Sequence, residues 1–356
     1  MNATMQFIED PTSSNGRHTG RFRFVMLKGF AGLGNRLLSL SACLTYAQET
    51  GRTVVVDWRD GMYAPRGVDA FKQIFMLSGA ADLQSLEGIP ISLIHPSSWS
   101  IGALHEPVDS LYELKTSPLP RIPTWLLPRG RMKMLNRFWG FRKTLSSSVR
   151  SGLFTFLRDA LRRNNFHLGR DLSRSLSSTV VIFADFSSDH SPAQLKTHLG
   201  LTTEMQSIVD QTSRQYYLWH NGGRRIGLHV RSTDRIPKKD VTRLIAILLQ
   251  RTERRDTFYL ATDNPCVDQI FRKALPNRIF PRNIFYPANF LQGLHRAPAS
   301  PDNKARILKE AVTDIWMLSQ VDVLYFQGSS SFSDVAAALL PASSISYDWE
   351  KQVAHA

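Results

Sequence analysis

The sequence predicts an α/β protein built from two Rossmann-like domains. Three observations carry this prediction. Short apolar runs rich in β-branched residues alternate with amphipathic helical patterns in both halves, the order that parallel sheets require. The 356 residues exceed one ordinary core and suit two. Glycine or serine turns follow predicted strands directly, at the sheet edge where α/β folds bind ligands.

We expect a flexible tail over residues 1–20, a first domain over 21–215 and a second over 216–356. The first domain is predicted to begin with a strand, a glycine turn, a helix and a second strand. Its expected elements are strands at 21–28, 53–58 and 178–183, a helix from Asn35 to Thr50, and a bridging helix at 201–220. Gly51 stands just past the first helix, as a terminating glycine commonly does.

The second domain repeats the alternation. Its expected elements are strands at 225–230, 257–261 and 321–326, helices at 240–253 and 303–320, a helix opened by Pro265, and a short helix after the turn Gly328–Ser331. Proline is well tolerated at a first helical position. The strands are short and mostly apolar, as buried parallel strands are.

Composition excludes several classes of protein. The only two cysteines, Cys43 and Cys266, belong to no metal-ligand cluster and suit a reducing compartment. The N-terminus lacks the apolar core of a signal peptide. No window reaches the roughly 18 apolar residues of a membrane span. We therefore expect a cytoplasmic protein.

Charge is concentrated in one segment. The net charge is +14, and residues 115–165 contain twelve Lys or Arg and one acidic residue, Asp159. This basic insert predicts docking on an anionic membrane, at its inner face, although a solvated basic surface is an alternative. Few aromatic side chains accompany the charges, so a nucleic-acid partner is not expected.

A glycine loop follows the first predicted strand. Gly29, Gly32 and Gly34 lack the G-x-G-x-x-G spacing of dinucleotide-binding folds, although Asp57 ends the next strand where such folds place a carboxylate. Either a ligand approaches the backbone here, beside Asn35 at the helix N-terminus, or the loop is only a tight turn.

The strongest local cluster ends the strand at 225–230. His229 and Arg231 share one face because strand side chains alternate. Arginine offers a planar fork for phosphate oxygens, which a departing nucleoside diphosphate needs. The alternatives are a surface pair of Arg231 with Asp234 and a structural role for His229.

Further polar groups lie at other strand ends or on a helix. Asp263 and Asn264 close a strand and either stabilise a loop or contact a ligand. Asp314 borders an apolar helical stripe and either accepts from guanine N–H groups or pairs with an arginine. Ser329 and Ser330 either cradle phosphates or cap a helix. The sequence contains no Asp-x-Asp, so no metal is expected and Arg231 supplies the cation.

These runs occur in a recognisable order. The sequences GLGNRLLSLSACLTYAQETGRTVVVDWRDGMY, IGLHVRSTDR, FYLATDN and ILKEAVTDIWMLSQVDVLYFQGSSSF resemble the α1,6-fucosyltransferase family, which includes nodulation and animal core fucosyltransferases. The resemblance covers residues 22–63 and 224–340. It implies the GT-B fold, with GDP-fucose bound between an acceptor-side first domain and a donor-binding second domain, inversion at the anomeric carbon, and no metal.

The resemblance also implies roles by position. Arg231 corresponds to the family's diphosphate-contacting arginine, His229 to its donor-site histidine, and Asp314 to its guanine-reading aspartate. Ser329 and Ser330 correspond to serines near the phosphates, and Asp263 to the first of two paired acids, the second being replaced by Asn264. The family's proposed acceptor base falls on Lys239, so Asp240, or else Asp234, is the candidate general base.

The predicted function is transfer of fucose from GDP-fucose to a glycan or glycolipid, one that contains N-acetylglucosamine. An acceptor hydroxyl loses its proton to a carboxylate while Arg231 stabilises departing GDP. Another GDP-sugar transferase of GT-B type is the first alternative. A dehydrogenase and a basic nucleic-acid-binding protein are weaker ones.

Overall fold

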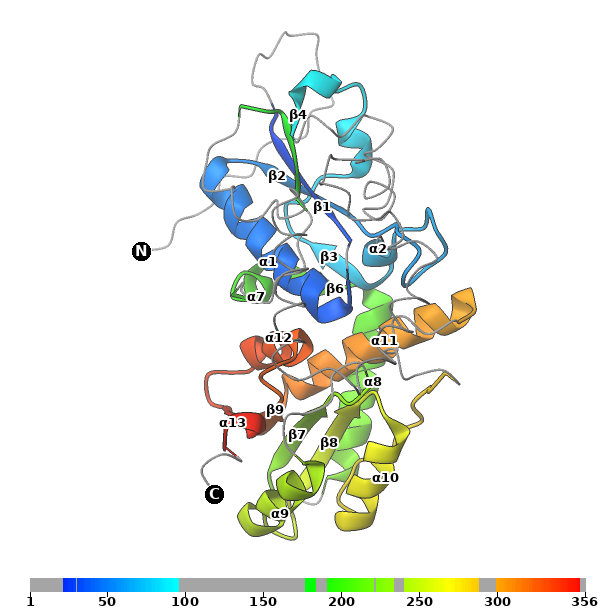
Figure 1. The fold of residues 1–356 in the computed structure, drawn as a ribbon, viewed down its shortest axis with the longest axis vertical. Coiled ribbons are helices and arrows are strands. Elements are labelled where there is room, and N and C mark those ends of the chain that lie inside the picture. The colour runs from blue at the N-terminus through cyan, green and yellow to red at the C-terminus, as the bar shows by residue number, and fades with distance from the viewer. Residues whose placement is uncertain are drawn as a thin grey trace, which may run out of the picture.

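The computed structural model describes residues 22–29, 31–95, 177–183, 191–220, 222–233, 240–287 and 299–352. The predicted tail and the basic insert 115–165 lie outside this part of the chain. Figure 1 shows two α/β lobes, the N-terminal half above and the C-terminal half below. No helix in the described ranges combines the length and apolar character needed to cross a bilayer.

The N-terminal half is built on a parallel sheet of order β2-β1-β5-β4. Its strands are β1 (Phe24–Lys28), β2 (Thr53–Asp57), β4 (Ile94–His95) and β5 (Val180–Phe183). The other elements are α1 (Leu33–Thr50), α2 (Ala70–Ile74), α7 (Leu195–His198), the antiparallel pair β3 (Phe75–Leu77) and β6 (Leu199–Leu201), and two short 3-10 turns, Leu83–Leu86 and Ile91–Leu93.

The C-terminal half has a second parallel sheet, of order β10-β9-β7-β8. Its strands are β7 (Arg225–Val230), β8 (Thr257–Thr262), β9 (Val323–Phe326) and β10 (Ile345–Asp348). Its helices are α9 (Val241–Arg251), α10 (Pro265–Ala274), α11 (Pro301–Leu318), α12 (Ser331–Leu339) and α13 (Trp349–Gln352). The predicted two-sheet α/β architecture is confirmed.

Alternation along β7 and β8 divides the second core between the two faces of the sheet. Leu228 and Leu260 pack with buried residues of α9 and α10. Tyr259 and Ala261 point the other way and join a core that includes residues of α11 and α12. Helices therefore cover both faces, as in doubly wound folds.

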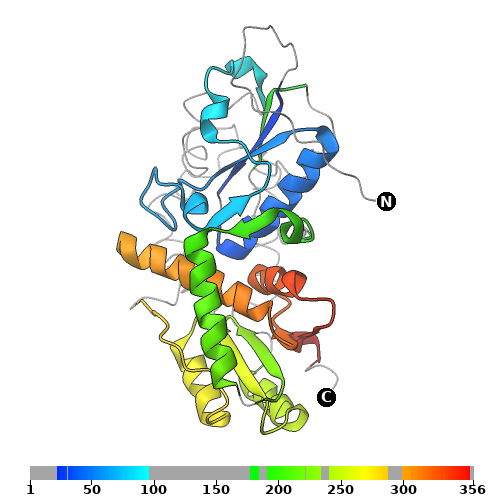
Figure 2. The same ribbon diagram turned by 180° about the vertical axis from the view of Figure 1, so that it is seen from behind.

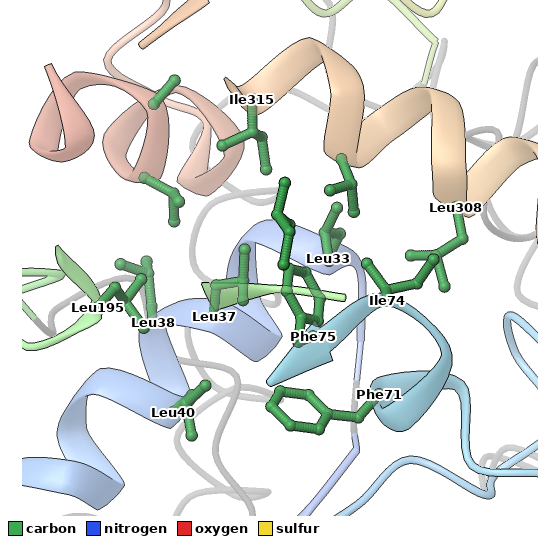
Figure 3. Close-up of a cluster of buried hydrophobic side chains, with 14 of the residues drawn as sticks. Leu33, Leu37, Leu38, Leu40, Phe71, Ile74, Phe75, Leu195, Leu308 and Ile315 are labelled. Carbon is green, nitrogen blue, oxygen red and sulfur yellow. The ribbon is translucent and has the colours of Figure 1, made fainter. Parts of the chain in front are cut away.

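The two halves share one apolar core. Figure 3 shows Leu33 and Leu37 of α1 close to Ile315 of α11, with Ile74 and Phe75 completing the cluster. In Figure 2, α8 (Thr203–Trp219) runs from β6 down along the C-terminal half and crosses α11. This shared core holds the carboxyl ends of both sheets against each other.

Most boundaries match the sequence prediction, and the exceptions have local reasons. Gly51 ends α1 in a left-handed conformation with φ 61°, as predicted. Helix α11 starts before residue 303 because the Ser300 side chain accepts from Asn303 N–H and Pro301 occupies the first turn. Strand β10 was not predicted, since Ile345 and Ser346 are exposed and form no apolar pattern. The predicted boundary between residues 215 and 216 falls inside α8 and stays a prediction.

Candidate functional site

His229 is buried at the end of β7. Its Nδ1 bonds to the Ser333 hydroxyl, and its ring stacks on Phe332 with centroids 4.9 Å apart. Burial, together with the nearby charge of Arg231, lowers the pKa of His229 to about 3. The imidazole is therefore neutral at physiological pH, which excludes it as a source of positive charge.

Arg231 follows β7 directly, and its charge is near enough to His229 to affect the pKa of that ring. Its backbone N–H donates to Gln327 Oε1 at 2.8 Å, and its Nε lies 3.9 Å from Asp263 Oδ2. The side chain remains 19% exposed. The glutamine fixes the backbone, and Asp263 lies at the outer limit of an ion-pair distance from the guanidinium.

Asp263 and Asn264 both have structural partners. Asp263 accepts from Ser232 N–H at 2.7 Å and from the Thr233 hydroxyl, which ties the loop after β7 to the end of β8. Asn264 Oδ1 accepts from Cys266 N–H at 2.9 Å and caps α10. The loop-stabilising alternative is thus observed, and ligand contact by either residue stays a prediction.

Asp314 pairs with an arginine, the alternative that the sequence had left open. The two terminal nitrogens of Arg282 each donate to one carboxylate oxygen, at 2.9 Å for Nη2–Oδ2. The Tyr259 hydroxyl also donates to Oδ1, at 2.8 Å. Both oxygens of this buried carboxylate are therefore engaged inside the protein.

The serine turn after β9 contains an unsatisfied hydroxyl. Ser330 stands at the N-cap of α12, but its side chain makes no capping bond. Its Oγ is fully buried and has no hydrogen-bond partner among the described residues. The predicted alternative of plain capping is therefore wrong for Ser330. Neighbouring Ser329 accepts from Gln327 Nε2 at 3.4 Å.

The glycine loop brings a second helix N-terminus to the same place. A Cβ on Gly34 would stand 2.5 Å from Phe332 N and 2.6 Å from Ser331 C. Only glycine allows this approach of α1 to α12. Gly32 is the N-cap of α1 and offers no side-chain cap, and Asn35 in the first turn is half-buried. The N-terminal turns of two helices, one from each half, thus meet at this point.

Arg36 stabilises this loop, and sequence reasoning missed it. Its side chain is fully buried and donates through Nε to Ala31 O at 2.8 Å and through Nη1 to Asp60 at 3.2 Å. Ala31 has φ 61°, a conformation uncommon for residues other than glycine. The guanidinium also lies over the Tyr63 ring, 5.1 Å from its centroid. An arginine on an otherwise apolar helix face was the available signal.

The general-base candidates differ in what the structure says of them. Asp240 is exposed and caps α9, accepting from Thr242 N–H at 2.9 Å. The Thr242 hydrogen bonds lower its pKa, which weakens it as a base. Asp234 lies outside the described residues. Asp57 bonds to Lys28 and Arg59, so it is not open to a dinucleotide ribose.

Comparisons with known proteins agree with the fold. No protein-family model matches the chain. Nodulation protein Z of Azorhizobium caulinodans is 24% identical over 328 residues, 87% of each protein. Crystal structures of NodZ α-1,6-fucosyltransferase, co-crystallised with GDP or soaked with GDP-fucose, cover 90% of this chain and 93% of theirs, at 19% identity and TM-scores of 0.54 and 0.52. The predicted GT-B fold and the resemblance to the nodulation fucosyltransferase are confirmed.

Proposed function

We propose that the chain is an inverting, metal-independent fucosyltransferase that moves fucose from GDP-fucose to a glycan or glycolipid containing N-acetylglucosamine. One observation carries the proposal. The N-termini of α1 and α12 meet at Gly34 and Phe332, with the unpartnered Ser330 hydroxyl at the α12 end and Arg231 directly after strand β7. The likeness to NodZ structures prepared with GDP and GDP-fucose supports the choice of donor.

A diphosphate suits this arrangement. Free N–H groups at a helix start, aligned with the helix dipole, favour an anion. Two such helix starts from opposite halves would bind a diphosphate between the halves, with Gly32, Gly34 and Asn35 on one side and Ser329 and Ser330 on the other. Arg231 would stabilise the negative charge that develops as GDP departs. Neutral His229, through Ser333 and Phe332, would position the α12 side of this site.

The reaction is a single displacement. An acceptor hydroxyl oxygen bonds to the anomeric carbon from the side opposite GDP, the bond from that carbon to the diphosphate oxygen breaks, and the hydroxyl proton passes to a carboxylate. Asp240 is a poor base because it is already engaged as a helix cap. We therefore favour Asp234 as the base and keep Asp240 as the alternative.

The acceptor side of the proposal rests on the sequence alone. The basic insert 115–165 would dock the enzyme on an anionic membrane, where a lipid-linked acceptor is presented. Co-sedimentation with phosphatidylglycerol vesicles at low and high salt tests this docking. Absence of pelleting at low salt would remove the membrane from the proposal.

Calorimetry and transfer assays test the function itself. We expect GDP to bind far more tightly than UDP, ADP or NAD, and transfer from GDP-fucose to proceed unchanged in EDTA. A rate that collapses in EDTA and returns with Mn²⁺ would contradict metal independence. Equal binding of all four nucleotides would contradict the donor assignment.

A further inference from the structure

The carboxyl end of β7 is held by side chains on one of its edges. Strand β8 pairs with β7 to its last residue, whereas pairing with β9 stops at Leu228. His229 and Arg231 are two residues apart, so their backbone polar groups face the same edge. Trp349 Nε1 donates to His229 O at 3.2 Å, and Gln327 Oε1 accepts from Arg231 N–H at 2.8 Å. Two side chains thus bond to the backbone where the ladder with β9 has ended.

The C-terminal helix α13 is connected to both of these side chains. It contains Trp349 itself, and the Glu350 carboxylate accepts from Nε2 of the fully buried Gln327 at 3.3 Å. The start of α13 is fixed in turn, because Asp348 Oδ1 accepts from Gly328 N–H at 3.2 Å and from Glu350 N–H at 3.1 Å. Helix α13 therefore reaches the end of β7 twice, once directly and once through the glutamine amide.

The buried Glu350 carboxylate selects the orientation of the Gln327 amide. An amide has an acceptor oxygen on one side and a donor nitrogen on the other, whereas an ionised carboxylate only accepts hydrogen bonds. Glu350 therefore favours the orientation that turns the nitrogen towards itself. The oxygen then faces the Arg231 N–H, which needs an acceptor. The reversed amide would bring two donors together at Arg231 and two acceptors together at Glu350.

We propose that Glu350 is a positioning residue for transfer, which acts through the Gln327 amide to set the place of Arg231 beside the departing diphosphate. This inference rests on the proposed function. A cation that stabilises charge developing in the transition state must be held accurately, since a misplacement of about 1 Å can lower a rate by about 100-fold. The unpredicted β10–α13 segment thereby becomes part of the machinery that places the arginine.

Steady-state kinetics with GDP-fucose test the positioning role. Glu350→Met keeps the length of the side chain but removes the acceptor, so kcat should fall by about 10- to 100-fold while KM for GDP-fucose changes little. Glu350→Gln retains an acceptor oxygen and should keep most of kcat. Lys351→Met is the matched control on the same helix, because Lys351 forms only an exposed ion pair with Asp348. An unchanged kcat in Glu350→Met would refute the inference.

A double-mutant cycle shows whether Glu350 acts through Arg231. Residues that work through one another have non-additive effects, whereas independent damage adds in free energy. Once Arg231→Lys has removed the guanidinium, Glu350→Met should lower kcat little further. If Glu350→Met lowered kcat by the same factor in the Arg231→Lys chain as in the unaltered chain, Glu350 would not act by placing the arginine.

Amide hydrogen exchange of the full chain, measured by NMR without nucleotide, tests the same contact without relying on activity. The Arg231 amide should exchange faster in Glu350→Met, while the Phe258 amide, which donates to Arg278 O at 2.8 Å, should keep its rate. A merely structural role would accelerate both amides, and that result or an unchanged Arg231 amide would overturn the inference. If the unaltered chain does not transfer fucose, the proposed function fails; if it does and Glu350→Met transfers equally well, only this inference fails.

Discussion

The carboxyl edges of the two parallel sheets face each other, yet they treat their polar groups in different ways. At the N-terminal edge the charges are neutralised internally, as in the buried Lys28–Asp57 pair and the Arg36–Asp60 pair. At the C-terminal edge, Ser330, Tyr286 and Arg282 each bury a polar atom that has no partner in the described residues, whereas the N-terminal edge has one such atom, the indole Nε1 of Trp58 directly after β2. We therefore interpret the N-terminal edge as a rigid support and the C-terminal edge as the surface that binds a ligand.

The difference suits the different roles that we propose for the two edges. Charges that satisfy one another hold the glycine loop and α1 in place but offer little to a nucleotide. Unpartnered groups raise the free energy of the empty protein, and a ligand that supplies the missing partners lowers it again. Substitutions at the first edge should therefore reduce stability, and substitutions at the second should reduce binding or transfer.

The largest loss of stability is expected from Asp57→Asn. It leaves Lys28 as a buried, uncompensated charge, which costs about 3–5 kcal/mol in the free energy of unfolding. Urea unfolding measures the loss, and the exposed Lys72–Asp82 pair provides the control, Asp82→Asn, with almost no effect. GDP affinity of the folded fraction should be unchanged. A fall in that affinity would break the distinction between the edges.

Arg231→Lys tests the opposite edge. Lysine keeps the charge but loses the fork, so we expect a loss of about 3 kcal/mol or more in transition-state stabilisation, read from kcat/KM with GDP-fucose. Thermal stability should change little, because Arg231 remains partly exposed. Arg225→Lys, at the other end of β7, is the control. Turnover near that of the unaltered enzyme would refute the role of Arg231.

Gly34→Ala acts where the two edges meet. The added Cβ would stand 2.5 Å from Phe332 N, so α1 and α12 must separate. Overpacking of this kind costs roughly 1–3 kcal/mol of stability and would displace the proposed phosphate contacts as well. Gly200→Ala is a fair control, since its nearest neighbour is 3.9 Å away. Full transfer activity in Gly34→Ala would show that the helix contact is not part of the site.

His229 should contribute a pH-dependent stability. Its folded pKa of about 3 lies below the ordinary value of 6.5, so its contribution is complete above pH 6.5 and is lost as the pH falls towards 3. Between pH 7 and 5.5 the unaltered chain should lose about 1 kcal/mol more than His229→Asn, which cannot titrate. Urea unfolding at both pH values measures this difference. Equal losses would mean that His229 is not buried in its neutral form.

Sequence reasoning found the parts of the site that are local in the chain. Strand β7 was predicted residue for residue, and His229 and Arg231 lie at its carboxyl end as expected. Pairing of Asp314 with an arginine was one of two alternatives, but the sequence did not identify Arg282, since the partners are 32 residues apart and Arg282 lies outside any helix or strand. Gln327, whose amide holds the Arg231 backbone, carries no local signal either. Contacts made by tertiary packing leave no trace in the periodicity of a segment.

The smallest effect is expected from substitutions of Asp240. Its carboxylate forms no ion pair like those of the N-terminal edge, and it is not a buried group without a partner like those of the C-terminal edge. It caps α9 and is exposed, and serine caps a helix nearly as well as aspartate. Asp240→Ser therefore removes the carboxylate but keeps the cap, and transfer should persist. Asp240→Ala removes both and should weaken only the start of α9. We expect Asp234→Asn to abolish transfer. If instead Asp240→Ser abolished transfer without changing GDP affinity, and Asp234→Asn left transfer intact, the Asp240 carboxylate would be the base.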